Sequence, residues 1–314
     1  MTQLPEALIP SPGDRGLATS DPGRLAASIA QSWALLAALV DDLDLDAITR
    51  AKGLSAREVV IPLGAWDDNR PLAALLDEAR AGVVGEHDQG ALVDAVRAAH
   101  RDEPDDAVRE AVRRQGDAME HFLYGDSVHE LGALPVASML GTLPLLTFLH
   151  AATYPLATSS LDLESAGAHV PDVLLENGLL GLVDTIGALA ARQGVTASIA
   201  AITPTRIVAT GATAGSWRTA VLDPDDLPGD LPGSVGPSVE GTARLIVDVT
   251  SGRADVPGAL RRKEITVHDF PGLLALAPIV EQVPGIPGRA ALVGAIRAAT
   301  ALTGVWRRLP FGDR

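Results

Sequence analysis

One acidic residue interrupts the apolar face of a predicted helix in the middle of the chain. From Pro171 to Gly194 apolar residues recur at helical spacing, with Pro171 suited to a first helical turn and Gly194 to a helix end. Asp184 lies inside this apolar stripe, where a carboxylate without a partner would be costly to bury. Asp184 therefore either faces a binding site as a general base or polar anchor, or lies at the helix edge as a partly exposed or arginine-paired acid.

His150 is the second candidate for acid–base chemistry. It is the only Asp, Glu, Lys, Arg or His in the stretch 131–161. Tyr154 follows four residues later, so one continuous helix would place both side chains on the same face. If that helix and the helix of Asp184 line one cavity, the three residues could form a catalytic acid–base set. The alternative is a histidine whose hydrogen bonds are satisfied within the core.

Helices must position these candidates, because the first 194 residues have a helical pattern. A serine at position 55 and Glu58 form a capping box at the start of the second helix, and Pro62 should kink or shorten that helix. The pattern indicates a bundle with inward-facing side chains. Apolar spacing predicts helices at about 24–43, 55–66, 70–81, 89–100, 103–124, 140–157 and 171–192.

Behind Gly194 the pattern changes to short β-branched runs separated by proline or glycine. The fold class expected for the whole chain is α+β. It comprises a flexible or loosely docked arm at 1–23, a helical bundle at 24–194 and a smaller domain containing a sheet at 195–314. Strands are predicted at 196–202, 206–210, 217–222 and 265–267, a long loop at 223–241, a strand or helix at 242–250, and an amphipathic helix at 287–306.

Composition excludes several classes of function. The 314 residues include 40 acidic and 25 basic side chains, a net charge of −15, which disfavours nucleic acid and anionic membranes as partners. The absence of cysteine excludes disulfides, a cysteine nucleophile and thiolate metal sites. The stretch 131–161 is long enough to span a membrane, but three prolines cut it, so no span is expected. The expected location is the cytoplasm.

Four strings of sequence resemble a known family. LSAREVVIPLGAWDDNR (54–70) and LLENGLLGLVDTIGALAARQGV (174–195) resemble the DinB-like, mycothiol-dependent maleylpyruvate isomerases of actinobacteria. VEGTARLIVDVTSGRADVPGALRR (239–262) and LLALAPIVEQVPGIPG (273–288) resemble the sterol-carrier-like domain that is often fused to them. The resemblance covers about 24–309 in order and pattern. It implies a DinB-like helical bundle followed by a sterol-carrier-like domain.

The resemblance also implies a divalent metal, usually zinc, held by a histidine of the second helix and by ligands on the later helix. This chain has Pro62 in place of that histidine, and Leu180 and Asp184 at the two later positions. Gly187 stands where the family usually has a further aspartate. One carboxylate is too few ligands for zinc. We therefore expect a scaffold that has lost its metal ligands, with no metal and no cofactor.

Two further groups of residues could contact a substrate. Trp66, Asp67 and Arg70 follow the second helix, at the level where the resemblance places the opening of the pocket. They could clamp a substrate, or they are an apolar staple with exposed charges. His87, His100 and His169 lie in polar segments and are expected to face solvent.

Leu180 belongs to the same expected pocket wall as Asp184. Arg206 and Arg218 lie in short strands, where the resemblance suggests arginines directed at an acidic substrate or a thiol. Ordinary arginines on the surface of a sheet are the alternative.

Together these features predict a metal-independent protein similar to maleylpyruvate isomerases. It would bind an apolar small molecule between its two domains and catalyse a proton transfer, isomerisation or cyclisation in secondary metabolism, as an isomerase or cyclase. One alternative is a mycothiol-dependent isomerase or thiol S-transferase. A second is a non-enzymatic carrier of a small molecule or lipid.

Overall fold

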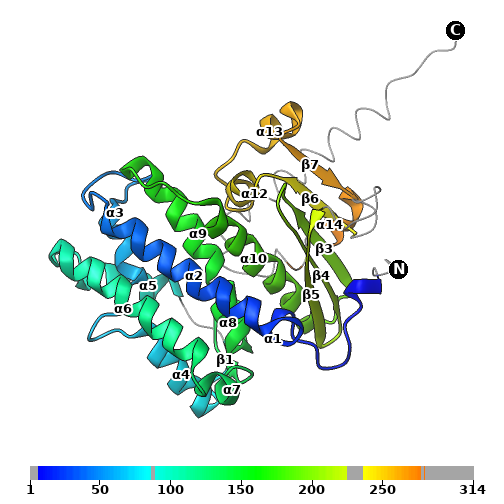
Figure 1. Cartoon of the computed structure of the whole chain (residues 1–314), viewed down its shortest axis with the longest axis horizontal. Helices are drawn as coiled ribbons and strands as arrows, with labels where there is room; N and C mark the ends of the chain where they lie inside the picture. The colour runs from blue at the N-terminus through cyan, green and yellow to red at the C-terminus, as the bar shows by residue number, and fades with distance from the viewer. Residues whose placement is uncertain (1–5, 86–88, 225–235, 277–278, 280–314) are drawn as a thin grey trace, which may run out of the picture.

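A long central helix separates two parts of the protein in the computed structural model, which describes residues 6–85, 89–224, 236–276 and 279. This helix, α10 (Asp172–Arg192), packs against helices on one side and a five-stranded sheet on the other (Figure 1). The fold class is α+β, as the sequence predicts, with the helices in the first part of the chain and a mixed sheet in the second.

The helices of the first part begin where the sequence offers a cap or a proline. In α2 (Pro22–Asp41), the Asp21 carboxylate accepts a hydrogen bond from the Arg24 amide and Pro22 occupies the first turn. The other helices of this part are α1 (Leu17–Ser20), α3 (Ala56–Val60), α4 (Pro71–Ala81), α5 (Gln89–Ala99), α6 (Asp105–Tyr124), α7 (Ser127–Leu131), α8 (Leu145–Ala151) and α9 (Thr153–Asp162), with 3-10 turns η1 (Glu6–Leu8), η2 (Ile61–Leu63) and η3 (Leu163–Ala166).

Proline determines where two of these helices end. The predicted capping box of Ser55 and Glu58 is confirmed, and α3 then gives way to the 3-10 turn that contains Pro62. The single helix predicted over 140–157 is wrong, because α8 ends at Ala151 and α9 begins at Thr153. Pro155 cannot donate a hydrogen bond to the preceding turn, so it fits only in the first turn of a new helix.

The sheet has the strand order β5-β4-β3-β6-β7. Strands β3 to β5 form antiparallel pairs, β3 and β6 run parallel, and β6 pairs antiparallel with β7. The prediction of a loop over the whole of 223–241 is wrong at its end, because strand β6 lies there. The segment 242–250, predicted as a strand or a helix, is a helix. The bounds are β3 (Ala197–Ile202), β4 (Ile207–Thr213), β5 (Ser216–Leu222), β6 (Ser238–Gly241), β7 (Ile265–His268), α12 (Ala243–Thr250), α13 (Val256–Arg262) and α14 (Phe270–Ala275). A separate two-stranded pair joins β1 (Pro135–Val136) and β2 (Leu143–Pro144).

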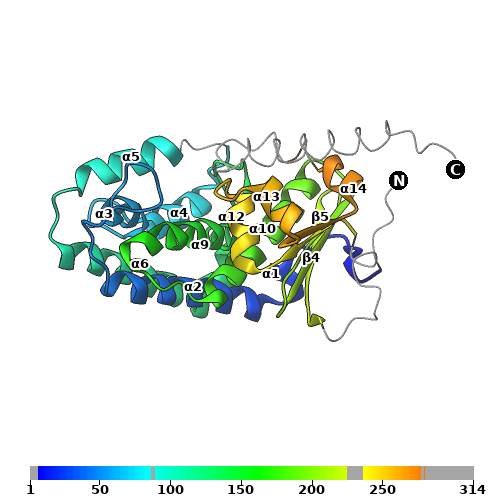
Figure 2. The same ribbon diagram turned by 90° about the horizontal axis from the view of Figure 1, so that it is seen from above.

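The described part of the N-terminal arm is packed against the sheet, unlike the flexible or loosely docked arm expected for it. Leu8 and Leu17 are each only 1% exposed. The Gly16 amide donates to the Trp217 carbonyl at 2.8 Å, and the Ser20 hydroxyl donates to the Thr219 carbonyl at 2.9 Å. The arm therefore continues the edge of the sheet at β5, beside which α1 lies (Figure 2).

Two described helices, α2 and α10, are long and apolar enough to cross a membrane by length and composition alone. The apolar window of α10 is 78% buried within the protein, which is typical of a core helix. The uncharged stretch 131–161 is divided among several short elements. The helix expected over 287–306 lies outside the described residues, as does most of the string 273–288.

Candidate functional site

His150 and Asp184 form a buried pair between α8 and α10. The His150 Nδ1 atom lies 2.8 Å from Asp184 Oδ2. The His150 side chain is fully buried and that of Asp184 is 1% exposed. The two residues that the sequence singled out are thus in direct contact, although they lie 34 positions apart. Their catalytic role stays a prediction.

Two glycines of α10 allow this contact, each three residues from Asp184. A Cβ atom on Gly181 would overlap the His150 carbonyl oxygen and the Thr153 hydroxyl, so α8 approaches α10 closely only because the position is glycine. A Cβ atom on Gly187 would overlap the Thr210 hydroxyl and crowd the Trp217 ring. The sheet can therefore approach α10 closely only because this position is also glycine. The carboxylate therefore lies where α8, α10 and the sheet meet.

Asp184 accepts hydrogen bonds from three parts of the chain. Its Oδ1 atom accepts from the Thr219 hydroxyl at 2.6 Å, the Trp217 indole N–H at 3.1 Å and the Leu17 amide at 3.3 Å. With His150 on Oδ2, four donors converge on the carboxylate, about as many as its lone pairs can accept. Thr219 and Trp217 alternate along β5 and so point to one face of the sheet. Neither residue can be identified from the sequence pattern, although the Gly181-x-x-Asp184-x-x-Gly187 spacing indicates that other elements approach α10 closely at Asp184.

This arrangement fixes the hydrogen of the imidazole ring. Because a carboxylate only accepts, the shared hydrogen belongs to His150 Nδ1, which leaves a lone pair on Nε2 in the neutral ring. Within the described part of the chain, Nε2 is buried and has no hydrogen-bond partner. The pair thus presents one basic nitrogen, oriented by a carboxylate, in a setting from which water is excluded.

Tyr154 does not complete the expected set of three. The Tyr154 side chain is directed to α12, where its hydroxyl lies 2.8 Å from Thr250 Oγ1. The Thr250 hydroxyl is itself 2.9 Å from the Ile246 carbonyl, to which it donates, so Tyr154 donates to Thr250. Burial raises the pKa of Tyr154 to about 12. Tyr154 therefore stays protonated near neutral pH.

Trp66, Asp67 and Arg70 make their contacts in the helical part. Trp66 is 4% exposed, donates to the Ile61 carbonyl at 3.0 Å, and stacks on His100 with ring centroids 3.9 Å apart. The stacking buries His100, contrary to the expectation that it faces solvent. The Asp67 side chain is 85% exposed and pairs with Arg70 and with an arginine of α6. The proposed clamp stays a prediction, although these contacts match the alternative of a staple with exposed charges.

Arg206 borders a hollow between α10 and the sheet. Its guanidinium lies 3.6 Å from the Glu176 carboxylate, which also accepts a hydrogen bond from Thr205. The hollow has an apolar floor and is a shallow depression, too narrow as it stands to admit a water-sized sphere. Leu180 follows the lining residue Leu179 on α10, and its side chain is fully buried in the main core. The lining residues are Glu176, Leu179, Ala201, Thr203, Arg206 and Val208.

Arg218 lies apart from this hollow. It follows Trp217 on β5 and so faces the opposite side of the strand from Trp217 and Thr219. Its guanidinium lies 3.7 Å from Asp14 of the N-terminal arm, and its side chain is 44% exposed. The structure therefore does not bring Arg206 and Arg218 together.

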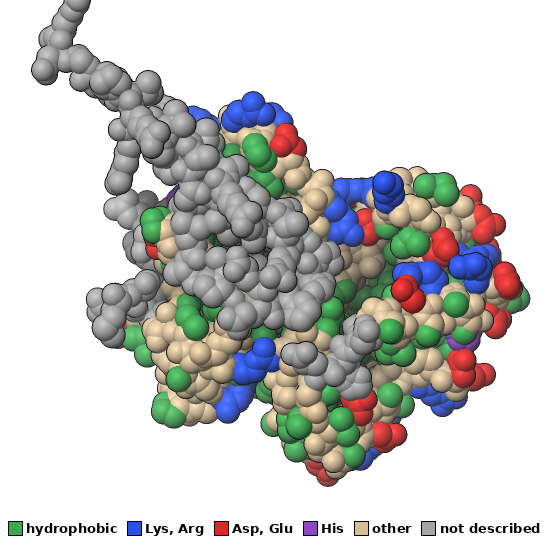
Figure 3. All heavy atoms as spheres, turned by 180° about the vertical axis from the view of Figure 1, so that it is seen from behind, with side chains coloured by type: hydrophobic (Ala, Val, Ile, Leu, Met, Phe, Trp, Pro, Cys, Tyr) green, Lys and Arg blue, Asp and Glu red, His purple; other side chains and the backbone are tan. Residues whose placement is uncertain are grey.

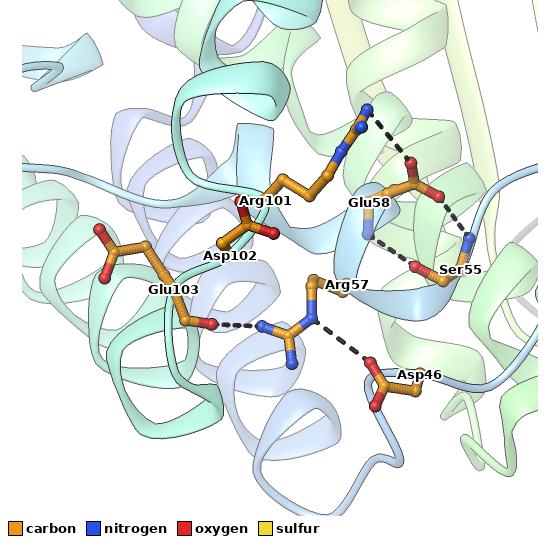
Figure 4. Close-up of a pocket in the computed structure, with 7 residues that line it drawn as sticks. All are labelled: Asp46, Ser55, Arg57, Glu58, Arg101, Asp102 and Glu103. Atoms are coloured by element: carbon orange, nitrogen blue, oxygen red, sulfur yellow. Dashed lines mark hydrogen bonds and ion pairs between the residues drawn. The ribbon is translucent and has the colours of Figure 1, made fainter.

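A second, larger cavity opens at the far end of the helical part (Figure 4). It has a volume of about 460 Å³ and lies where the start of α3 meets the turn between α5 and α6. Its two arginines are already paired: Arg57 lies 3.5 Å from Asp46 and donates to the Glu103 carbonyl, and Arg101 approaches Glu58. Acidic and basic side chains are interspersed over this end of the molecule (Figure 3).

The residues at the expected metal positions do not fit a metal ion. Pro62 and Leu180 have no side-chain donor atom, and a metal at Asp184 would have to displace the donors already bound to it. Among the described residues no group of three or more His, Asp and Glu is arranged to hold a metal ion. No step of the proposed chemistry is therefore assigned to a metal.

Comparison with known proteins finds no matching family model and no matching curated protein. Two solved structures are similar. One is a mycothiol-dependent maleylpyruvate isomerase in an alanine-mutant form, with a TM-score of 0.49 and 14% identity over 80% of this chain and 95% of the other. The other is the same enzyme, with a TM-score of 0.48 and 14% identity over 76% of this chain and 92% of the other. The sterol-carrier-like domain and the loss of metal ligands stay predictions.

Proposed function

We propose that this protein binds a small molecule and moves a proton within it, with His150 as the base. The observation that supports this proposal is the buried His150–Asp184 pair with Nε2 left without a partner. A histidine oriented by a carboxylate through Nδ1 can accept a proton at Nε2 and return it, while the carboxylate stabilises the imidazolium that forms.

The chemistry is an isomerisation. His150 Nε2 takes a proton from a carbon next to a carbonyl group, and the electron pair of the broken C–H bond is delocalised onto the carbonyl oxygen. Where a C=C bond adjoins the carbon that loses the proton, the proton returns to the far end of that bond. The double bond thereby moves into conjugation with the carbonyl group, and the neutral imidazole is restored. The step needs no metal and no oxidant. It agrees with a chain that has Pro62 and Leu180 at positions where the resemblance implies ligands.

We place the substrate between the helices and the sheet, with its entrance at the hollow beside Arg206. The floor of the hollow is apolar and its rim carries Arg206, Glu176 and Thr203. This combination suits an apolar molecule with one polar or acidic end. Entry of a ligand would require the Arg206–Glu176 ion pair to open.

The test is an isomerisation assay with maleylpyruvate, the substrate named for the two similar structures, run with and without mycothiol and with and without a chelator. The variant His150→Gln removes the base and should lower the rate by about 10²-fold or more. His268→Gln is the matched control, because His268 forms a partly exposed pair with Glu240 at 2.7 Å. It should change the rate by less than about twofold.

The results of this assay distinguish a His150-dependent isomerase from a thiol-dependent enzyme and from a carrier. A rate that is equal in the His150→Gln variant and the wild type contradicts the proposal. A rate that requires mycothiol supports the thiol-dependent isomerase or S-transferase. No turnover with or without mycothiol contradicts an isomerase acting on this substrate and favours a carrier.

A non-enzymatic carrier is the second candidate, favoured by the four donors on Asp184. Because these donors come from the arm, α8 and β5, the His150–Asp184 pair could serve only to join three parts of the chain. In that case His150→Gln would lower stability and leave the binding of a ligand unchanged. Mass spectrometry of the native protein purified from its host, which detects a bound ligand and a bound metal together, is the corresponding measurement.

A further inference from the structure

We infer that Thr219 is a positioning residue for the His150–Asp184 pair, acting from the sheet on a base that the helices supply. The inference rests on the proposed function in one respect: the position of the imidazole hydrogen matters only if His150 acts as a base. The geometry that supports it is independent of any substrate.

The Thr219 hydroxyl has one hydrogen to donate, and the distances around it favour one acceptor. Thr219 Oγ1 lies 2.6 Å from Asp184 Oδ1 and 3.1 Å from Thr210 Oγ1. The carboxylate oxygen can only accept, so the proton lies on the shorter contact. The Thr210 hydroxyl has its own acceptor in the Arg218 carbonyl at 3.1 Å. Thr219 is therefore a donor to Asp184.

This donor determines how the carboxylate is turned. The Thr219 hydroxyl gives the shortest of the three contacts on Oδ1, ahead of the Trp217 indole and the Leu17 amide. Holding Oδ1 toward the sheet leaves Oδ2 toward α8, where it accepts from His150 Nδ1. Without Thr219 the carboxylate would lose its strongest fixed donor and could rotate about its terminal torsion, which is broad. The hydrogen of the imidazole would then no longer be confined to Nδ1.

The experiment is long-range ¹H–¹⁵N NMR of the imidazole rings in the full chain labelled with ¹⁵N-histidine, with His150 assigned through His150→Gln. In the wild type we expect the His150 ring to carry its hydrogen on Nδ1. Thr219→Val should move a measurable fraction of the ring to the form protonated on Nε2. Thr219→Ser keeps the hydroxyl and should restore the wild-type spectrum. Thr210→Val is the matched control and should leave the spectrum unchanged.

Two results would overturn the inference. One is a His150 spectrum in Thr219→Val that is identical to that of the wild type. The other is a wild-type His150 protonated on Nε2, which decides the matter even if the valine variant does not fold. Neither result depends on turnover. If His150→Gln keeps full activity while Thr219→Val shifts the spectrum, the proposed function fails and the positioning inference stands.

Discussion

At the scale of single residues, Asp184 and Tyr154 remain buried by different means. Four hydrogen-bond donors surround the Asp184 carboxyl group, whereas Tyr154 donates its one hydrogen to Thr250. Burial is the largest cause of the raised pKa of Tyr154, and the hydrogen bond to Thr250 only partly offsets it. This difference leads to a prediction at alkaline pH.

Tyr154→Phe should remove a pH dependence of stability between about 10 and 12. Below pH 10 the folded and unfolded chains both keep the Tyr154 proton. Above it the unfolded chain releases the proton while the folded chain keeps it up to about pH 12. The free energy of unfolding therefore falls with rising pH by about 1.4 kcal/mol per unit over this window.

The measurement is urea unfolding of the wild type and Tyr154→Phe from pH 8 to pH 12. At pH 8 the variant should be less stable by about 1 kcal/mol, for the lost hydrogen bond. The two free-energy curves should converge as the pH rises above 10 and cross before pH 12, because the fall of about 1.4 kcal/mol per unit exceeds the initial difference of about 1 kcal/mol. Curves that stay parallel over this range would contradict the raised pKa.

The sequence could indicate His150 and Asp184 because each is a polar residue in an apolar segment. It could not show that Thr219 and Trp217 would complete the site, because alternation along a strand does not identify the helix that its face will meet. It also placed Tyr154 beside His150, because helical periodicity continues through Ala152 and Pro155 ends the helix only through its missing N–H.

At the scale of elements, the N-terminal arm is bound to the site through a glycine. Gly16 has φ +58° and lies against the Asp184 carboxylate and the Trp217 indole. Prolines and glycines in the first 23 residues suggested a loose arm, because they disfavour regular structure. The same glycine content permits the close approach that holds the arm in place.

Gly16→Ala should detach the arm from the sheet. A Cβ atom there would overlap both Asp184 Oδ1 and Trp217 Nε1, in addition to the strain of a positive φ. We expect a loss of about 3 kcal/mol or more in the free energy of unfolding. Trypsin should also cut faster after Arg15, whose guanidinium donates to the Gly215 carbonyl when the arm is docked.

Gly13→Ala is the matched control for this prediction. Gly13 also has a positive φ, +92°, but a Cβ atom there would meet nothing within 4 Å. Gly13→Ala should lower the free energy of unfolding by about 1 to 2 kcal/mol, through backbone strain alone. Equal losses in the two variants would show that contact with Asp184 and Trp217 contributes nothing.

At the scale of the whole molecule, the hydrophobic core crosses the boundary between the helices and the sheet. The main core cluster includes Leu25 and Ile29 of α2 together with Ala201, Val208 and Ile265 of the sheet. The change from helical periodicity to short β-branched runs behind Gly194 predicts a domain boundary at 194/195. Periodicity reports on elements one at a time, and it carries no information on whether neighbouring elements share a core. The division into domains stays a prediction that unfolding can test.

A buried ion pair joins α9 to the segment after α12. The Nε and Nη2 atoms of Arg253 donate to the two carboxylate oxygens of Asp162, whose side chain is 6% exposed. Arg253→Met would leave this carboxylate buried without its partner, so we expect a loss of about 2 to 3 kcal/mol, somewhat less than for a fully buried pair because Arg253 is 25% exposed. The double variant Asp162→Asn/Arg253→Met should lose less than the sum of the two single changes.

Denaturant unfolding followed by circular dichroism and by tryptophan fluorescence measures both the loss and its cooperativity. Arg262→Met is the control, because Arg262 and Glu264 are 58% and 46% exposed and an exposed pair contributes little to stability. If the helices and the sheet unfold together, both signals should shift equally in Arg253→Met. Separate transitions, with only one moved by the substitution, would instead establish two domains that fold independently on either side of residue 194.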